Sequence, residues 1–346
     1  MIIIHLIYLQ TYYHVNNIYK TKYQNFFILY YKIRMEDIFI SGSIGYIHLK
    51  NDNNHILLLS DNHSSTNYCK IDNSQFISEW LLTKNSKVLL EEVPRIKGSE
   101  LLELWSSKQH TQKLKDLYLN NKQIEGIDIR PLLIPFNLDI FKINNIDKEY
   151  IEEIKNTYII NYLKSLDSFF ELKHKYFIEN IGNMYTDINN EQLNNHFLEL
   201  QRDYDNLKKQ YYKHDLVIKI DEENKNKLDE LLSSIMEWYT IAKIFYNNEL
   251  GINKFIIHAG LFHTTNLNKI LINLYGYKEI NSDGIIDILK IKDNDDINDI
   301  KDDDNCLKIP SVMNSQFGGY DKKYRKYKEK YLTLKNNIFG IIRKIK

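Results

Sequence analysis

Short apolar runs bounded by turn residues recur along the chain and predict buried β-strands. They occupy residues 38–49, 55–60, 87–94, 123–131, 255–260 and 284–291. Runs of this length, rich in isoleucine, leucine and valine, are typical of strands that are covered on both faces. Asparagine and aspartate at residues 51–54 predict a turn between the first two strands. His48 and His55 flank this turn and are interpreted as surface residues.

Helices are predicted where apolar residues recur at spacings of three and four. Short helices are expected at residues 74–83, 98–120 and 266–275. Three longer segments, at residues 150–176, 191–212 and 222–248, form a predicted helical insertion that covers residues 147–250. Because strands alternate with helices and carry charged residues at their ends, the predicted fold class is α/β, with a mixed sheet flanked by helices.

The chain divides into four segments by composition. Residues 1–34 contain no acidic side chain and precede Met35, so we interpret them as a peripheral extension or as an upstream segment that translation from Met35 would omit. Residues 35–291 form the predicted α/β core with its insertion. Residues 292–316 begin with an acidic run of low hydrophobicity and are expected to be a solvated linker.

Residues 317–346 form a predicted amphipathic helix. Its tyrosines at positions 320, 324, 327 and 331 make one aromatic stripe in a basic background. We expect this helix to pack on the body of the protein or to contact a protein partner. Interleaved basic and aromatic residues also suit nucleic acid or a membrane surface, which is the alternative interpretation. The segment resembles the Tyr/Lys C-terminal segments of many proteins of giant DNA viruses, which implies a viral protein of the host cytoplasm or the virion.

The overall composition narrows the function classes. The 46 basic and 46 acidic residues cancel, so the chain has no general attraction for nucleic acid. The apolar start of the chain is too short for a membrane span and lacks the features of a secretory signal, so no transmembrane segment is predicted. The two cysteines, Cys69 and Cys306, are too few for a disulfide framework, which favours a reducing intracellular setting.

Polar residues follow the ends of the predicted strands, where sites form in α/β sheets. The candidates are Asp61 with His63, Glu91 with Glu92, Asp128 with Arg130, and His258 with His263. Two or three histidines with a carboxylate can hold a divalent metal and leave a position open for water. Without a metal, His63 is a candidate general base that a glutamate orients. Arg130 is expected to bind an anionic group or a developing oxyanion.

Each candidate also has a structural interpretation. His258, at the strand end itself, fits a hydrogen-bonded core residue or a supporting contact. Side-chain alternation sends Glu91 and Glu92 to opposite faces, so at most one of them is catalytic. Asp128 and Arg130 also fit a structural ion pair. The sequence Asp61-Asn-His63 resembles the opening motif of metallophosphoesterases, but the Gly-Asp-x-x-Asp and Gly-Asn-His motifs that those enzymes need are absent.

The order of these motifs resembles the TraB/TIKI and erythromycin-esterase/ChaN-like superfamily. Its members carry a Gly-x-x-His after the first core strand, a glutamate that ends the next strand, often a charged strand end with arginine, and a second Gly-x-x-His late in the chain. Here the matching sequences, in chain order, are Ser60-Asp-Asn-His63, Leu89-Leu-Glu91-Glu92-Val, Gly126-Ile-Asp128-Ile-Arg130 and Gly260-Leu-Phe-His263. The first match has serine in place of glycine.

The resemblance implies a mixed sheet with helices on both sides and a site made of His63, Glu91 or Glu92, and His263. TIKI-like members are described as metal-dependent peptidases, and esterase-like members as hydrolases that use histidine and glutamate; ChaN-like members are associated with haem-iron binding. We therefore expect a hydrolase in which activated water attacks a peptide or ester carbonyl of a small-molecule or peptide substrate. The expected divalent metal is Mn, Zn, Co or Fe, held by His63, Glu91 and His263. The alternative is an inactive binding or virion-associated protein on the same fold.

Overall fold

The computed structural model describes residues 37–61, 69, 71, 74–94, 109–133, 163–171, 190–213, 216–217, 222–290 and 306–318. The predicted extension at residues 1–34, the acidic run at residues 293–305 and the Tyr/Lys-rich helix beyond residue 318 lie outside the described residues. His63 does too. In the described part of the chain, no helix is long and apolar enough to cross a membrane.

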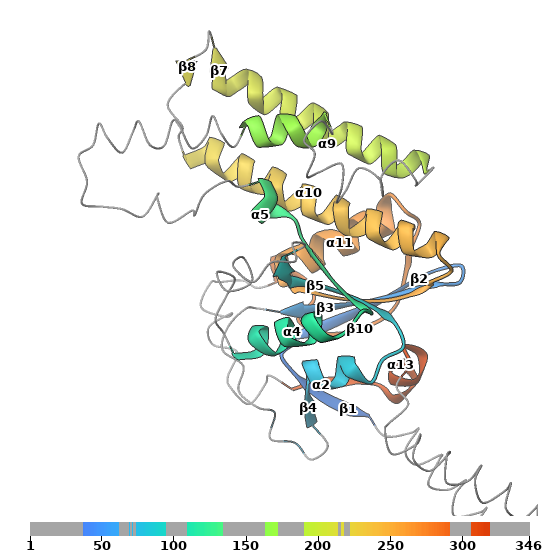
Figure 1. Ribbon diagram of the computed structural model, residues 1–346. Coiled ribbons are helices and arrows are strands. Elements are labelled where there is room, and N and C mark those ends of the chain that lie inside the picture. The colour runs from blue at the N-terminus through green and yellow to red at the C-terminus, as the bar shows by residue number, and fades with distance from the viewer. Residues whose placement is uncertain are drawn as a thin grey trace, which may run out of the picture.

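A six-stranded mixed sheet forms the centre of the fold (Figure 1). Its strands, in spatial order, are β10 (Lys278–Gly284), β2 (Gly45–Asn51), β3 (Asn54–Asp61), β9 (Lys254–Gly260), β5 (Lys87–Pro94) and β6 (Ile124–Asp128). The four strands from β3 to β6 are parallel, while β2 and β10 are antiparallel to their neighbours. The predicted α/β class with a mixed sheet is therefore confirmed.

Helices cover both faces of this sheet (Figure 1). One face carries α9 (Glu191–Tyr211), α10 (Glu222–Glu249), α11 (Leu261–Asn273) and the helix at residues 163–170. The other face carries α2 (Ile77–Leu82), α4 (Gln109–Asn120) and α13 (Ser311–Gln316). Alternation along β3 supplies both cores, because Ile56 and Leu58 face the first set of helices while Leu57 and Leu59 face the second.

The remaining elements are short. They are β1 (Ile38–Ser41), β4 (Ser74–Phe76) and β11 (Leu307–Ile309) of a second sheet, β7 (Tyr212–Lys213), β8 (Leu216–Val217), α5 (Arg130–Leu133) and η3 (Ile288–Lys290). In the second sheet, β1 lies between β11 and β4.

Several predicted boundaries are wrong, each for a physical reason. The last strand of the central sheet along the chain is β10, at residues 278–284 and not 284–291, and it is an exposed edge strand whose polar residues give no apolar pattern. The run at residues 123–131 ends as a strand at Asp128, and Arg130 begins α5. Residues 74–76 form a strand before α2, and α11 begins at Leu261, five residues earlier than predicted.

The C-terminal segment, which we define as residues 306–318, is part of the folded domain and not a solvated linker. Within it β11 pairs with β1, and Phe317 is fully buried in the core beside α2. The prediction of a linker across residues 292–316 is therefore wrong for residues 306–316. The cause is the shortness of both elements, since three strand residues and six helix residues leave no periodic signal.

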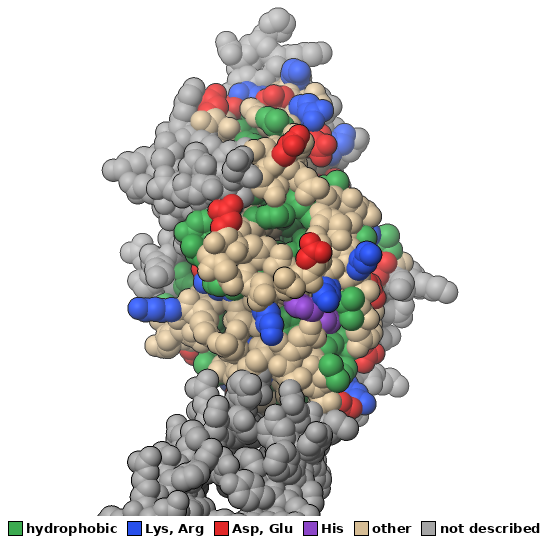
Figure 2. Space-filling view, turned by 90° about the vertical axis from the view of Figure 1, so that its right-hand side faces the viewer, with side chains coloured by type: hydrophobic (Ala, Val, Ile, Leu, Met, Phe, Trp, Pro, Cys, Tyr) green, Lys and Arg blue, Asp and Glu red, His purple; other side chains and the backbone are tan. Residues whose placement is uncertain are grey.

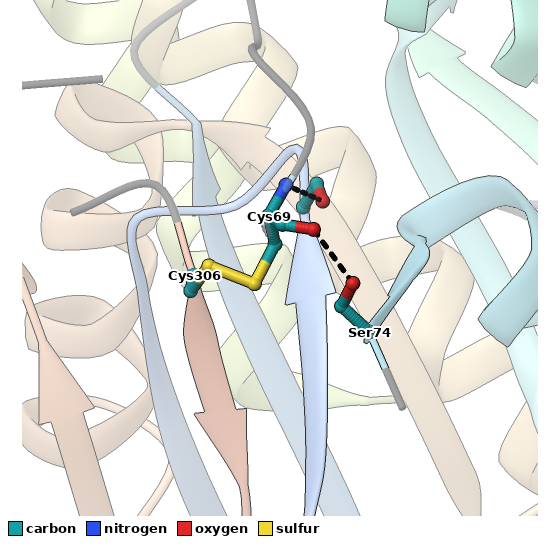
Figure 3. Close-up of a disulfide and its surroundings, with 4 residues drawn as sticks. Cys69, Ser74 and Cys306 are labelled. Carbon is teal, nitrogen blue, oxygen red and sulfur yellow. Dashed lines mark hydrogen bonds between the residues drawn. A yellow bond between two sulfur atoms is a disulfide. The ribbon is translucent and has the colours of Figure 1, made fainter. Parts of the chain in front are cut away.

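A disulfide between Cys69 and Cys306 fixes the start of this C-terminal segment (Figure 3). The two Cα atoms are 5.2 Å apart although 237 positions separate them in the sequence. The backbone N–H of Cys69 donates to the Ser41 hydroxyl at 3.0 Å, and the Ser74 hydroxyl donates to the Cys69 carbonyl at 2.7 Å. The two cysteines therefore pair in the fold, which their wide separation in the sequence does not indicate.

Lys84 is the most unusual residue at the contact between α2 and α13. Its side chain is only 5 % exposed, its ammonium contacts the Asn314 side-chain oxygen, and it lies 4.1 Å from the centre of the Trp80 ring. Burial lowers the pKa of this lysine to about 7. Folding at neutral pH therefore has to desolvate a charge or remove a proton.

Replacing Lys84 with methionine is expected to raise the free energy of unfolding by about 2 kcal/mol near pH 7, because a buried charge is exchanged for an apolar group of similar length. The lysine pKa is lower in the folded than in the unfolded chain, so its cost is greatest near pH 7 and fades as pH rises toward about 10.5. Urea denaturation near pH 7 and pH 9.5 measures this difference. The exposed Lys209→Met variant is the control, and an equal gain there would contradict the burial argument.

Candidate functional site

The candidate site lies where the carboxyl ends of the parallel strands β3, β9 and β5 meet. Asp61 at the end of β3 is the register partner of Gly260 at the end of β9, and Leu90 of β5 is the partner of His258. The chain turns directly from β9 into α11 at Gly260. The two strand ends that precede the predicted Gly-x-x-His-like motifs are thus neighbours, as the motif order predicts.

Glu91 connects β5 to the start of α11. Its Oε2 accepts a hydrogen bond from the backbone N–H of Gly260 at 2.6 Å, and only 4 % of the residue is exposed. Gly260 is the N-cap of α11 and has no side chain to satisfy this end of the helix, so Glu91 provides the negative charge that a helix N-terminus favours. The other oxygen, Oε1, is left to face Arg130 and His263.

Arg130 holds together three of the predicted residues. Its Nε and Nη2 donate to the two oxygens of Asp128, both at 2.8 Å, and Nη2 also donates to Glu91 Oε1 at 2.8 Å. Burial by itself lowers the pKa of Arg130, but the carboxylates of Asp128 and then Glu91 outweigh burial and raise it above its ordinary value. The guanidinium is a permanent cation, and the proposed ion pair with Asp128 is present.

His263 lies in the first turn of α11 and is 6 % exposed. Its Nδ1 is 3.1 Å from Glu237 Oε1, and its Nε2 is 3.0 Å from Arg130 Nη1. A guanidinium only donates hydrogen bonds, so Nε2 accepts in this arrangement and Nδ1 carries the proton that goes to Glu237. Nε2 also lies 3.2 Å from Glu91 Oε1. The basic nitrogen of His263 therefore faces the same point as Glu91 and Arg130.

Glu237 is the functional candidate that sequence reasoning missed. It lies in the middle of α10, is 2 % exposed, and accepts hydrogen bonds at Oε1 from both His263 and Asn266, the latter at 3.0 Å. The sequence contained a signal for this residue, which is a glutamate between two large apolar residues in a predicted helix. The structure shows that these neighbours, Met236 and Trp238, are fully buried. A charge in such a position needs a partner, which was reason enough to single it out.

Three buried carboxylates lie at the site among the described residues. Glu91, Asp128 and Glu237 are each no more than 4 % exposed, while Arg130 is the cation that contacts two of them. Within the described part of the site, three carboxylates and one guanidinium favour a further cation.

Ser60, which replaces the expected glycine, joins the two halves of the site. Its hydroxyl oxygen is 2.8 Å from the Thr264 hydroxyl oxygen in α11. The side chain at this position therefore makes a specific contact between β3 and the helix that carries His263. The serine substitution is accommodated in the fold, and it adds a hydrogen bond that glycine could not make.

The other predicted residues have different positions. Nε2 of His258 is 2.8 Å from the carbonyl oxygen of Gly42, which supports its structural interpretation. Asp61 is 1 % exposed at the end of β3. The side chain of Glu92 and all of His63 lie outside the described residues. The structure thus brings together Glu91, Asp128, Arg130 and His263, and it adds Glu237.

The fit of a metal depends on the donor atoms at this point. In the part of the chain that the structure describes, no group of three or more His, Cys, Asp or Glu side chains is placed to hold a metal ion. The described donors that face one another are His263 Nε2 and Glu91 Oε1, 3.2 Å apart, a separation that suits two ligands of one ion. His63 is the third ligand that the motif order would supply.

Comparison of the chain with protein-family models, with curated proteins and with solved structures finds no match.

Proposed function

We propose that the protein is a hydrolase in which a water molecule attacks a peptide or ester carbonyl, with His263 as the general base. The observation that carries the proposal is the Glu237–His263–Glu91 arrangement at the carboxyl edge of the sheet. In it, Nε2 of the buried His263 accepts a hydrogen bond from Arg130 and lies near Glu91, while the carboxylate of Glu237 accepts the proton of Nδ1. A base oriented in this way is the arrangement that acid–base catalysis requires.

The proposed reaction uses each described residue in one role. His263 Nε2 takes a proton from water while the water oxygen bonds to the carbonyl carbon. The same nitrogen then gives this proton to the leaving-group oxygen or nitrogen as its bond to the carbonyl carbon breaks, which leaves a carboxylic acid and an alcohol or amine. Glu237 stabilises the imidazolium that forms between these two steps. Arg130 stabilises the negative charge on the carbonyl oxygen of the substrate. For this, the guanidinium exchanges its hydrogen bond to His263 for one to that oxygen. Phe262, 40 % exposed and edge-on to the His263 ring, offers apolar surface to a substrate.

A divalent metal is the second form of the proposal, with His263, Glu91 and His63 as its ligands. In this form Nε2 of His263 would bind the ion and would not act as the base. Such an ion lowers the pKa of a bound water and so supplies hydroxide near neutral pH. The excess of buried carboxylates supports a cation here. Elemental analysis of purified protein for Mn, Zn, Co and Fe, before and after chelation, measures the amount of metal bound per chain. Less than about 0.1 metal per chain, with no gain in thermal stability on adding these ions, would contradict this part of the proposal.

One observation favours the alternative, a binding protein without catalysis. Arg130 Nη1 donates to His263 Nε2, so the nitrogen that a base needs free already has a partner. In a binding protein this contact would be permanent and the network would only stabilise the sheet edge. The two functions differ in one measurable property. A hydrolase shows catalytic turnover that depends on His263, whereas a binding protein does not.

Hydrolysis of p-nitrophenyl butyrate and of fluorogenic dipeptide amides tests the proposal. His263→Gln is expected to lower kcat/KM by about 100-fold or more, because a general base contributes about 10²–10⁴ to the rate. Glu237→Gln is expected to lower kcat more than it changes KM, since it acts on the charged form of His263. His196→Gln, a buried histidine whose Nδ1 is 3.1 Å from the Tyr275 hydroxyl oxygen, is the matched control. A wild-type rate no higher than that of His263→Gln would support the binding protein.

A further inference from the structure

A second pair of histidines lies far from the candidate site, at the contact between the β2–β3 hairpin and the C-terminal segment. His48 Nε2 is 3.1 Å from His55 Nδ1, and the side-chain nitrogen of Gln316 is 2.7 Å from the same His55 Nδ1. His48 is only 3 % exposed, so its interpretation as a surface residue is wrong. Figure 2 shows histidine atoms reaching the surface beside basic side chains on this face.

The hydrogen-bond chemistry fixes the protonation of this pair. The Gln316 side-chain nitrogen only donates, so His55 Nδ1 must accept and carries no proton. Nε2 of His48 then has to be the donor toward the same atom. The Gln316 nitrogen also lies 3.3 Å from His55 Nε2, but its shorter contact, like that of His48, is with His55 Nδ1.

The other contacts between the hairpin and the C-terminal segment lie next to this histidine pair. The Phe317 ring packs edge-on against His48 with 5.4 Å between ring centres, and the Phe317 carbonyl accepts a hydrogen bond from the Ser86 hydroxyl at 2.8 Å. The Gln316 carbonyl accepts a hydrogen bond from Lys254 Nζ at 2.7 Å. The opposite end of the C-terminal segment is held covalently at Cys306.

We propose that His48, His55 and Gln316 form a pH-sensitive switch that fastens the end of the C-terminal segment to the hairpin and releases it when His55 binds a proton. A proton on His55 Nδ1 replaces the shared lone pair with an N–H that points at two other N–H groups. The hydrogen bond from the Gln316 nitrogen is lost, and the one to His48 persists only if His48 moves its own proton to Nδ1 and accepts at Nε2. The segment then detaches at Gln316 and Phe317 while the disulfide keeps its start in place.

The neighbouring charges act in the same direction. In the sheet, the register partners of His55 are Lys50 in β2 and Lys254 in β9, so both lysines share its face. The residues that α13 and its C-cap bring to the pair, Gln316 and Phe317, carry no charge. An added positive charge on His55 is therefore repelled by Lys50 and Lys254, with no described carboxylate in contact to offset it.

The pKa shifts give the pH window. Burial, then Lys50 and Lys254, lower the pKa of His55, and burial, then His55 and Lys50, lower that of His48 to about 4. Histidines whose pKa is lowered by folding stabilise the fastened form fully above their unfolded value of about 6.5. This contribution is lost as the pH falls from there toward about 4. Release is therefore expected on mild acidification.

Backbone hydrogen exchange followed by mass spectrometry, with the disulfide intact during labelling, tests the switch between about pH 7.5 and pH 4.5. After correction for the intrinsic pH dependence, protection of residues 306–318 should fall by about tenfold or more between pH 7 and pH 5. Protection of the central strand β9 should change by less than about threefold. His55→Gln keeps an acceptor oxygen without titrating, and it should abolish most of the fall, whereas His196→Gln should retain it.

Three results would overturn the switch. They are unchanged protection of residues 306–318 across this range, the same fall in His55→Gln as in the wild type, and loss of protection in β9 together with the C-terminal segment. If His55→Gln does not fold, NMR titration of the histidine ring protons in the wild type decides. The midpoint for His55 has to match the midpoint for release, and a difference of more than about one pH unit refutes the link.

Discussion

Replacing Arg130 with methionine is expected to lower the free energy of unfolding by about 3–5 kcal/mol, because it leaves Asp128 and Glu91 buried without their cation. Asp128 is fully buried and Glu91 nearly so, and Arg130 contacts both at 2.8 Å. The loss would be the penalty of isolated buried charge and not the value of the ion pairs themselves. Denaturant unfolding monitored by circular dichroism near pH 7 measures it.

A charge-neutral partner variant separates this cause from a loss of packing. Adding Asp128→Asn to Arg130→Met removes one unpaired carboxylate and should recover about 1–2 kcal/mol. The exposed Arg202→Met variant should change stability by less than about 0.5 kcal/mol. A defect that Asp128→Asn does not relieve would indicate lost packing.

Breaking the disulfide is expected to have the second large effect, lowering the free energy of unfolding by about 2–5 kcal/mol. The link closes a loop of very great length, with 237 positions between its ends, and in the chain-entropy account long loops gain the most from closure. Cys306→Ser and reduction of the wild type are two independent ways to break it. Denaturant unfolding with and without a phosphine reductant compares them.

The reductant itself provides the control. It should destabilise the wild type and leave the Cys69→Ser and Cys306→Ser variants unchanged, because neither variant has a bond to reduce. The amides of residues 306–318 should exchange faster in both variants, since β11 then loses its covalent link and keeps its pairing with β1 and its packing in the core. If reduction leaves the wild-type transition where it was, the covalent link contributes nothing to stability.

The strands of the sheet centre were predictable because burial on both faces makes them continuously apolar. The runs in β3, β5 and β9 stand out in the sequence for this reason. Edge and short strands were not predictable. Nearly every residue of β10 is exposed or partly exposed, and β11 has three residues, so neither leaves a pattern in the local sequence.

The candidate site divides along the same line. Glu91, Arg130 and His263 were found because polar residues at the ends of adjacent parallel strands must meet at one edge. Glu237 reaches the site through the packing of α10 against α11. The sequence of a helix does not by itself determine how the helix is rotated about its axis when it packs on a sheet. The pairing of His48 with His55 was hidden as well, because their burial depends on Phe317, which lies far along the chain.

The position of β9 between β3 and β5 has a consequence for how the protein is made. During synthesis β3 and β5 leave the ribosome long before their common neighbour, which is encoded about 160 residues after β5. Until then two buried strands have open edges, a state prone to aggregation. Because Gly260 and His263 directly follow β9, the same late segment completes both the sheet and the site. Nascent chains that end before β9 should therefore be insoluble.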